Sequence, residues 1–365
     1  MRPLRVCFLH QGMMGYQDVC QRAMAELGDE LLTVYPGTMP DTAFDDSHFV
    51  DYGEKLVWQG EPPSAAELVK LVDDFNPDAV MMRAWKGDAY RAVMKARKGK
   101  SLRVMFSSNV WLNAPRQWVG RATHRWYLRP WYDCAYVPGE RSEFYVRRLG
   151  FAGEDIIRGA NCADVDTFQS PPRTGEELAS RRRFVFSGRL VWHKAIDTLT
   201  EAYRQYRDQV EDPWTLSVAG TGPLLKDFDG LPGVEQHGFL QPAELADLMR
   251  RSSALLFPSH VDFWGVIVHE GGSAGLPMIC SDGVGAVPYL LQDGFNGWVT
   301  PAGNASALAG LMVRMTEAGP ERLQEMSDGS RALSSRLSPQ IWARHLHEEI
   351  ELRLPAALRG ERWRG

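Results

Sequence analysis

Two carboxylates stand eight residues apart in the stretch VDFWGVIVHEGGSAG, Val261–Gly275. The residues between Asp262 and Glu270 are almost all apolar, which predicts a helix that begins near Trp264. The free N–H groups at the start of such a helix would face a negatively charged ligand. Four residues would supply this donor-binding backbone: Phe263, Trp264, Gly265 and Val266.

Both acids suit a ligand that carries hydroxyl groups. Glu270 lies about two turns into the predicted helix and can accept hydrogen bonds from vicinal hydroxyls such as those of a ribose. Asp262 precedes the helix, where it can hold the hydroxyls of a second sugar. A simpler interpretation stays open, in which Asp262 only caps the helix and Glu270 is a partly exposed helix carboxylate.

A second stretch, SGRLVWHK, places cations where an anion would be bound. It begins at the end of a predicted strand with Gly188 and Arg189, and it ends with His193 and Lys194 at the start of a predicted helix. Cations at a helix N-terminus oppose the helix dipole unless an anion is also present. We therefore predict a diphosphate site here, while two solvated basic residues on a loop are the alternative. His193 is expected to pack at the helix start.

Two further strand exits carry glycines that allow a ligand close to the backbone. VAGTGPL contains Gly220 and Gly222, and QHGFLQP contains the run Gly238, Phe239 and Leu240, which suits the edge of a flat base. Glycines also mark ordinary strand-to-helix turns, so this pattern is weak by itself.

Strand–helix alternation supplies the elements that position these residues. Continuous apolar strands such as RVCFLH, DAVMMR and LRVMFSS indicate parallel sheets covered on both faces. The alternation pauses at QSPPRTGEELAS and then restarts, which predicts an α/β fold of two Rossmann-like, doubly wound domains facing each other across a cleft. We expect a first domain over 1–168, a linker over 169–180 and a second domain over 181–338. A final helical stretch, about 339–365, is expected to pack back on the first domain.

Bulk composition excludes several classes of protein. The net charge of -5 argues against a nucleic-acid binder, and no apolar run is long enough for a membrane helix. The apolar core of the N-terminus is too short for a signal peptide. Five cysteines without a CxxC pair suit reduced thiols, which favours the cytoplasm.

Taken together, the motifs of the second half resemble a known family. GRLVWHKAIDTLTEAY, AGTGP, HGFL and DFWGVIVHEGGSAGLP resemble the C-terminal donor domain of GT-B glycosyltransferases, in the retaining, family-4-like group, over roughly Phe184–Met312. The resemblance implies that Arg189 and Lys194 bind the donor's diphosphate and that Glu270 binds the ribose. Asp262 would hold the transferred sugar, although the group usually has a Glu there and a Phe at the position of Trp264.

The first half resembles the group less closely. The resemblance implies a glycine-rich first loop that touches the phosphates, and HQGMMGY offers Gly12 and Gly15 there. Many relatives carry a His at the end of a middle strand, where this chain has acceptor-side candidates instead: Ser107, Ser108 and Asn109. Asp164 and Asp166 occupy a position that is usually acidic in the group, and we interpret both as structural.

The predicted activity is retaining transfer of a sugar from a nucleoside-diphosphate sugar, with UDP favoured, to a hydroxyl acceptor in polysaccharide, glycolipid or natural-product glycoside synthesis. No bound cofactor and no metal are expected, because Arg189, Lys194 and helix N-termini would stabilise the leaving phosphate. The alternatives are a non-catalytic nucleotide-sugar binding protein and an epimerase of the same fold. A dehydrogenase is excluded, since no GxGxxG follows the first strand.

The segment 115–148 carries seven arginines against three acids, interleaved with tryptophans and tyrosines. One interpretation is peripheral contact with the inner face of a membrane. The interpretation that we favour from the sequence is an amphipathic helix whose aromatics pack on the sheet while its arginines face water. The oligomeric state is left open.

Overall fold

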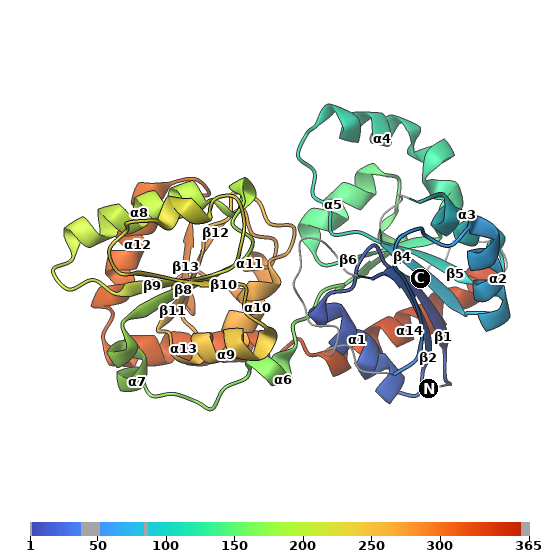
Figure 1. Cartoon of the computed structure of the whole chain (residues 1–365). Coiled ribbons are helices and arrows are strands. Elements are labelled where there is room, and N and C mark those ends of the chain that lie inside the picture. The colour runs from blue at the N-terminus through green and yellow to red at the C-terminus, as the bar shows by residue number, and fades with distance from the viewer. Residues whose placement is uncertain (1, 38–51, 84–86, 359–365) are drawn as a thin grey trace. The chain divides into compact units, whose positions relative to one another are not determined.

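The computed structural model describes residues 2–37, 52–83 and 87–358, which form two compact α/β units. The N-terminal unit comprises Met1–Cys162 together with Pro339–Gly365, and the C-terminal unit comprises Ala163–Ser338. Each unit is built around one parallel sheet (Figure 1).

The N-terminal unit has a seven-stranded sheet in the order β3-β2-β1-β4-β5-β6-β7, with every pair parallel. Its inner strands β1, β4, β5 and β6 are buried, largely apolar runs, as a sheet that is covered on both faces requires. The strands β3 and β7 were not expected from the sequence, because they are short or half-exposed edge strands. The strands are β1 (Arg5–Leu9), β2 (Glu30–Pro36), β3 (Glu54–Trp58), β4 (Ala79–Arg83), β5 (Leu102–Phe106), β6 (Cys134–Val137) and β7 (Ile156–Arg158).

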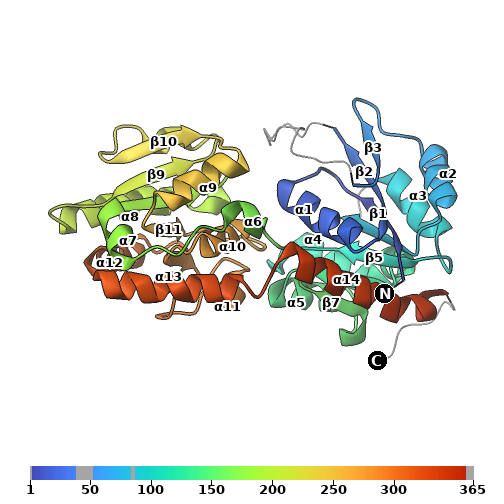
Figure 2. The same ribbon diagram turned by 90° about the horizontal axis from the view of Figure 1, so that it is seen from below.

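Helices cover both faces of this sheet. Alternate strand residues such as Ala135 and Val137 share a core with α2, α3 and α5. Tyr136, between them, points the other way and lies 6.0 Å from the ring of Trp342 on α14, which packs beside α1 (Figure 2). The helices of the unit are α1 (Gly15–Glu26), α2 (Ala65–Phe75), α3 (Asp88–Ala96), α4 (Pro115–Tyr127), α5 (Glu140–Arg148) and α14 (Pro339–Leu358).

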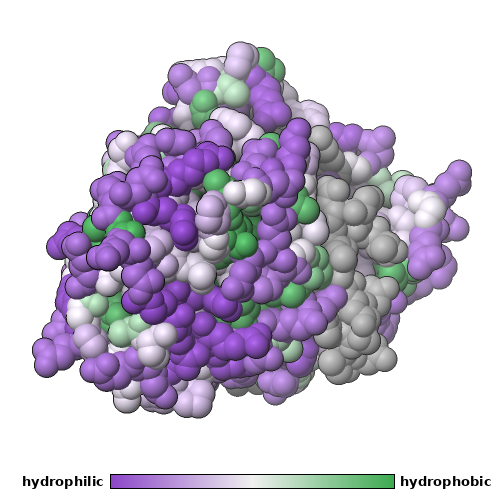
Figure 3. All heavy atoms as spheres, turned by 60° about the vertical axis from the view of Figure 1, so that its left-hand side comes forward, coloured by the Kyte–Doolittle hydropathy of each residue, from purple (hydrophilic) through white to green (hydrophobic). Residues whose placement is uncertain are grey.

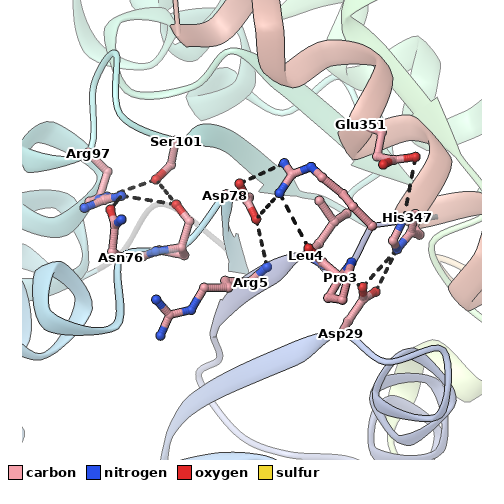
Figure 4. A network of polar contacts seen from close by, with 12 residues as sticks. Pro3, Leu4, Arg5, Asp29, Asn76, Asp78, Arg97, Ser101, His347 and Glu351 are labelled. Carbon is pink, nitrogen blue, oxygen red and sulfur yellow. Dashed lines mark hydrogen bonds and ion pairs between the residues drawn. The ribbon is translucent and has the colours of Figure 1, made fainter.

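A buried polar contact ties the C-terminal helix α14 to the first strand (Figure 4). The Nδ1 atom of His347 lies 3.0 Å from both carboxylate oxygens of Asp29, and the two side chains are almost fully buried. Asp29 also accepts a hydrogen bond of 2.9 Å from the backbone N–H of Leu4, at the entry to β1. A chain segment more than 300 residues away in sequence is thereby fixed to the start of the sheet.

The C-terminal unit has a six-stranded parallel sheet in the order β10-β9-β8-β11-β12-β13. Figure 1 shows α8 and α12 on one face of this sheet and α7, α9 and α13 on the other. The strands are β8 (Arg183–Ser187), β9 (Thr215–Ala219), β10 (Val234–Gly238), β11 (Ala254–Phe257), β12 (Met278–Ser281) and β13 (Gly297–Thr300). The helices are α6 (Val165–Phe168), α7 (Gly175–Arg181), α8 (Ile196–Gln209), α9 (Pro242–Arg250), α10 (Val266–Ser273), α11 (Val287–Leu290), α12 (Ala305–Glu317) and α13 (Pro320–Ser334).

The segment 169–180 is part of the C-terminal unit and is not the linker that its Pro and polar residues suggested. Arg173 is buried and donates hydrogen bonds to the carbonyls of Arg250, Ser252 and Ala274 at 3.0, 3.1 and 2.8 Å. Burial lowers the pKa of this guanidinium to about 10. Thr174 then caps α7. The boundary between the units falls instead at Cys162 and Ala163.

The favoured interpretation of the basic and aromatic segment is wrong for α4. None of its residues is buried, and its tryptophans do not pack on the sheet: Trp118 is 48% exposed and Trp126 is 78% exposed. Over the part of the chain that the structure describes, no helix combines the length and apolar character needed to cross a bilayer.

Candidate functional site

Two of the candidate segments of the second half, those that contain Lys194 and Asp262, meet where the strand order of the C-terminal sheet reverses. β8 lies between β9 and β11, so the chain leaves β8 for one side of the sheet and later returns to its other side at β11. Ligands of open α/β sheets bind beyond the carboxyl ends of strands at such a point. The segments that follow β8 and β11 lie side by side there, since the N–H of Val261 donates to the carbonyl of His193 at 3.4 Å.

Lys194 and Asp262 meet at this point as an ion pair. Their side chains are 14% and 13% exposed, and the ammonium also lies 4.8 Å from the ring centroid of Phe257. Lys194 does not begin the helix, as the sequence suggested, but ends the 3-10 turn Trp192–Lys194. Ala195 follows with a left-handed φ of 57°, and α8 begins at Ile196.

Asp262 has a second partner at the start of the neighbouring helix. One of its carboxylate oxygens accepts a hydrogen bond of 3.1 Å from the backbone N–H of Trp264. Gly265 then takes a φ of +85°, and a Cβ there would lie 2.9 Å from the side chain of Val284. The helix α10 begins at Val266, two residues after the predicted start. The N-cap of α10 is Gly265, which has no side-chain hydrogen bond, so Asp262 holds the loop before the helix and is not the N-cap that the simpler interpretation offered.

Glu270 lies on α10 in a setting that favours its neutral form. Burial raises the pKa of Glu270 to about 7, and the nearby negative charge of Asp164 adds to that rise. Asp164 accepts hydrogen bonds from the N–H and hydroxyl of Thr167 at 3.3 and 2.7 Å, which agrees with a structural role at the start of α6.

His269, a residue that was not selected from the sequence, joins α10 to the segment before α6 and to the end of α13. It is fully buried, and its Nδ1 accepts a 3.0 Å hydrogen bond from the backbone N–H of Ala163. Its Nε2 therefore carries the proton and donates to the carbonyl of Ser334 at 3.1 Å. Its position next to Glu270 in the sequence is the signal that could have indicated it.

Arg189 is exposed just beyond β8, next to the ion pair. Burial lowers the pKa of the half-buried His193, and the positive charges of Lys194 and Arg189 lower it further. The negative charge of Asp262 acts in the opposite direction. The four groups thus lie close enough to act on one another electrostatically. The exposed Arg189 can turn toward an anion, whereas Lys194 is held in its ion pair with Asp262.

The glycines after β8 and β9 hold two loops against each other. The N–H of Gly188 donates to the carbonyl of Ala219 at 3.0 Å, and a Cβ at Gly220 would lie only 1.9 Å from the carbonyl oxygen of Gly188. Likewise a Cβ at Gly222 would lie 2.4 Å from the carbonyl oxygen of Leu190. Close backbone packing accounts for these two glycines without a ligand.

The remaining donor-binding candidates fall into two groups. Gly238, with a φ of +67°, has open space where a Cβ would lie, and the Phe239 and Leu240 that follow are half-buried. Phe263 is 40% exposed, whereas Trp264 is buried with its ring 5.4 Å from that of Tyr289. Trp264 therefore packs in the core.

The other predicted residues belong to the N-terminal unit. Gly12 is buried after β1, and Gly15 is the first residue of α1. Ser107 follows β5 with its hydroxyl buried and its N–H bonded to the carbonyl of Tyr136 at 3.0 Å, while Ser108 and Asn109 are half-buried. Among the residues that the structure describes, no three His, Cys, Asp or Glu side chains cluster as metal ligands would.

Comparisons with known proteins agree with this geometry. Residues 173–332 match the family Glycosyl transferases group 1. The phosphatidyl-myo-inositol mannosyltransferase of Mycobacterium leprae is 26% identical over 214 residues, which cover 56% of this chain and 56% of that protein. The D-rhamnosyltransferase WbpZ of Pseudomonas aeruginosa is 26% identical over 164 residues, 43% of this chain and 41% of that protein. The chain spans about half the length of these curated relatives.

Solved structures share the fold of the whole chain. Anabaena HepE, in a crystal structure with UDP and glucose, superposes with a TM-score of 0.73 at 16% identity and covers 95% of this chain and 99% of that one. WaaG, a glycosyltransferase involved in lipopolysaccharide biosynthesis, superposes with a TM-score of 0.67 at 13% identity, covering 95% and 99%. Residues 173–332 are thus similar to the glycosyl transferases group 1 family, and the two α/β units have the GT-B fold of these solved structures.

Proposed function

We propose that the protein is a retaining glycosyltransferase that moves a sugar from a nucleoside-diphosphate sugar, UDP-sugar in the first instance, to a hydroxyl-bearing acceptor. The observation that carries the proposal is the grouping of Arg189, Lys194 and Asp262 at the switch point of the C-terminal sheet, inside the segment that matches the family. Anionic groups of a ligand fit two cations there, and hydroxyl groups fit a carboxylate.

In the proposed complex Arg189 and Lys194 bind the diphosphate, and the N–H groups at the start of α10 complete its surroundings. The backbone of Gly238, Phe239 and Leu240 contacts the base. Glu270 accepts hydrogen bonds from the ribose, and Asp262 holds hydroxyls of the sugar. Lys194 is paired with Asp262 in the structure. When a donor binds in this way, the ammonium of Lys194 therefore contacts both the diphosphate and the carboxylate of Asp262.

In the proposed reaction, the bond between the anomeric carbon and the diphosphate oxygen breaks while the acceptor oxygen forms a bond to that carbon on the same face. The departing phosphate takes the proton of the acceptor hydroxyl. Positive charge on the sugar ring and negative charge on the phosphate grow together, and the two cations stabilise the latter. We propose that no metal takes part, which transfer in the presence of EDTA would test.

Residues of the N-terminal unit are proposed to serve the acceptor side. Gly12 and Gly15 would approach the phosphates, and Ser107, Ser108 and Asn109 would face the acceptor. Burial of all five cysteines agrees with reduced thiols, so we propose the cytoplasm as the compartment. UDP is the first carrier to test because HepE was solved with UDP and with UDP-glucose.

The test measures thermal stability with UDP, GDP, ADP and TDP, followed by turnover of a labelled sugar donor. A nucleotide at about 100 times its Kd stabilises the folded state by about 2.7 kcal/mol. We expect one nucleotide to raise the Tm, the Lys194→Ala protein to lose that rise, and Lys226→Ala, which removes an exposed lysine of the same unit, to keep it.

The outcomes separate the candidates. Transfer with retained anomeric configuration, read by NMR of the product, supports the proposal. A Tm shift without turnover on any acceptor supports a nucleotide-sugar binding protein, and interconversion of donor sugars supports an epimerase. An unchanged Tm with all four nucleotides would contradict the donor site itself.

A further inference from the structure

The helix α4 of the N-terminal unit presents its apolar side chains to solvent. An α-helix has about 3.6 residues per turn, so Trp118, Val119, Ala122 and Trp126 share one face of α4. Trp118, Val119 and Trp126 are 48%, 62% and 78% exposed. Leu112, just before the helix, is 50% exposed as well. The ring of Trp118 lies edge-on to that of Trp111 at 5.3 Å, whereas Val119 and Trp126 remain mostly exposed, so most of this apolar face of α4 is left to solvent.

The opposite face of α4 contacts the body of the unit through small and polar residues. A Cβ at Gly120 would lie 3.7 Å from the side chain of Leu149, and the ring of His124 occupies the space where a Cβ of Gly150 would lie. A surface helix of a globular protein normally buries its apolar face and exposes its polar one. In α4 the arrangement is reversed, which a structural role in this unit does not explain.

Positive charge surrounds the apolar face of α4. No acid occurs between Pro115 and Tyr132, and Arg116, Arg121 and Arg125 are exposed. The guanidinium of Arg121 lies 5.3 Å from the ring of Trp118. The charge of this segment is opposite in sign to the net charge of -5 of the whole chain.

A basic hollow lies between α4 and α5, beside the apolar face. It is lined by Arg121, His124, Arg147, Arg148 and Gly150. Arg147 forms an ion pair with Glu143 at 2.7 Å. Burial lowers the pKa of His124, and the positive charges of Arg125 and Arg129 lower it further. The hollow thus places guanidinium groups of Arg121, Arg147 and Arg148 beside the apolar face of α4.

Figures 1 and 3 show where this surface lies. α4 is the uppermost helix of the N-terminal unit in Figure 1, and at the same height the space-filling view of Figure 3 shows hydrophobic atoms among hydrophilic ones. A helix of 13 residues is about 20 Å long, too short to span a bilayer but long enough to lie in its surface.

We propose that α4 binds the surface of an anionic lipid bilayer. Trp118, Val119 and Trp126 insert at the boundary between headgroups and acyl chains, while exposed arginines and the basic hollow contact the lipid phosphates. Amphipathic helices with tryptophan on one face and arginine beside it bind membranes in this way, and each arginine adds to the affinity for anionic lipid. This inference does not depend on the proposed transfer reaction.

The test is cosedimentation of the full chain with vesicles of phosphatidylcholine alone or mixed with phosphatidylglycerol, at low and high salt. We expect binding to the mixed vesicles that high salt weakens, and binding to neutral vesicles that is weaker by about tenfold or more. Trp118→Ser/Trp126→Ser should lower binding to mixed vesicles by about tenfold or more. Arg121→Gln/Arg125→Gln should also lower it and should reduce the salt dependence.

A matched control lies on α14, where Leu352 and Arg344 are exposed as well. Leu352→Ser/Arg344→Gln should bind vesicles as the parent does. A circular dichroism spectrum and a Tm of thermal unfolding equal to the parent's show that each variant is folded.

Three results would contradict the proposal that α4 binds a membrane. The folded parent would not bind anionic vesicles, or the α4 variants would bind them as well as the parent does. In the third, the parent would bind no vesicles but would self-associate, and Trp118→Ser/Trp126→Ser would abolish that association. Failure of the transfer assay would leave this measurement unaffected, so the two proposals are tested separately.

Discussion

The ammonium of Lys194 is paired with the carboxylate of Asp262, which lies 68 residues further along the chain. The pair joins the segment after β8 to the segment before α10, and Asp262 also accepts a hydrogen bond from the N–H of Trp264. Lys194 is proposed to bind the diphosphate of a donor and Asp262 its sugar. The ion pair between them holds both side chains in place.

Replacing Asp262 by Asn should separate nucleotide binding from transfer. Asn keeps an oxygen for the Trp264 N–H but loses the negative charge that occupies Lys194. We expect UDP without a sugar to bind about fivefold more tightly, a gain of about 1 kcal/mol, because the diphosphate no longer meets a nearby carboxylate. Transfer should fall by about 100-fold, since an ionised group near the sugar is lost. Calorimetric titration and turnover measure the two effects.

The Asp262→Ala protein is the matched control for this hydrogen bond, because it also removes the oxygen that accepts from Trp264. It should be less stable than Asp262→Asn by about 1 kcal/mol, the usual net contribution of one hydrogen bond. Weaker UDP binding by Asp262→Asn would show that the pair serves to position Lys194 and does not compete with the phosphate.

Glu270 should give the folded protein a pH dependence that Glu270→Gln lacks. Burial raises the pKa of Glu270 from 4.5 to about 7, so between these values the folded state holds a proton that the unfolded state has lost. Its contribution to stability is complete below pH 4.5 and is lost as pH rises to 7. Relative to Glu270→Gln, the free energy of unfolding should fall by about 2 to 3 kcal/mol from pH 5 to pH 8.

Urea unfolding of the parent and of Glu270→Gln at pH 5 and pH 8 measures this difference. The other titrating groups are the same in the two proteins, so their effects cancel in the comparison. Parallel stability curves would mean that Glu270 is ionised throughout. Donor binding should follow the opposite course and strengthen toward pH 7 in the parent alone, since the ionised carboxylate accepts hydrogen bonds from ribose hydroxyls.

Gly220 and Gly238 differ in what a methyl group would meet. A Cβ at Gly220 would strike the carbonyl oxygen of Gly188, whereas at Gly238 it would meet open space. Both have positive φ, so Gly238→Ala should cost about 1 kcal/mol from backbone strain alone. Gly220→Ala should cost about 2 to 4 kcal/mol, because the loop after β8 must also move. Equal losses in chemical denaturation would contradict the close packing of the two loops.

His347 should be a main support of the N-terminal unit. Replacing it by Ala leaves Asp29 as an uncompensated buried acid beside β1, which should cost about 3 kcal/mol. Glu348→Ala, one residue further on the exposed side of α14, should change the free energy of unfolding by less than about 0.5 kcal/mol. Urea unfolding followed by a probe in the N-terminal unit distinguishes the two. A small loss for His347→Ala would mean that α14 is held by apolar packing alone.

Local pattern was sufficient to predict much of this fold. Continuous apolar strands followed by amphipathic helices predicted two doubly wound sheets, and both sheets are present and parallel. Motif spacing also selected Lys194, Asp262 and Glu270 before any contact was known. These features depend on residues close together in sequence, where periodicity and turn chemistry act directly.

The tertiary structure decided what depends on residues distant in sequence. Composition made 169–180 look like a linker, but the carbonyls that Arg173 binds lie about 80 to 100 residues away. Amphipathic spacing gave α4 an apolar face without indicating that this face is left uncovered. The pairing of Lys194 with Asp262 and the raised pKa of Glu270 arise only when separate segments meet and exclude water, because burial and charge act through space and not along the chain.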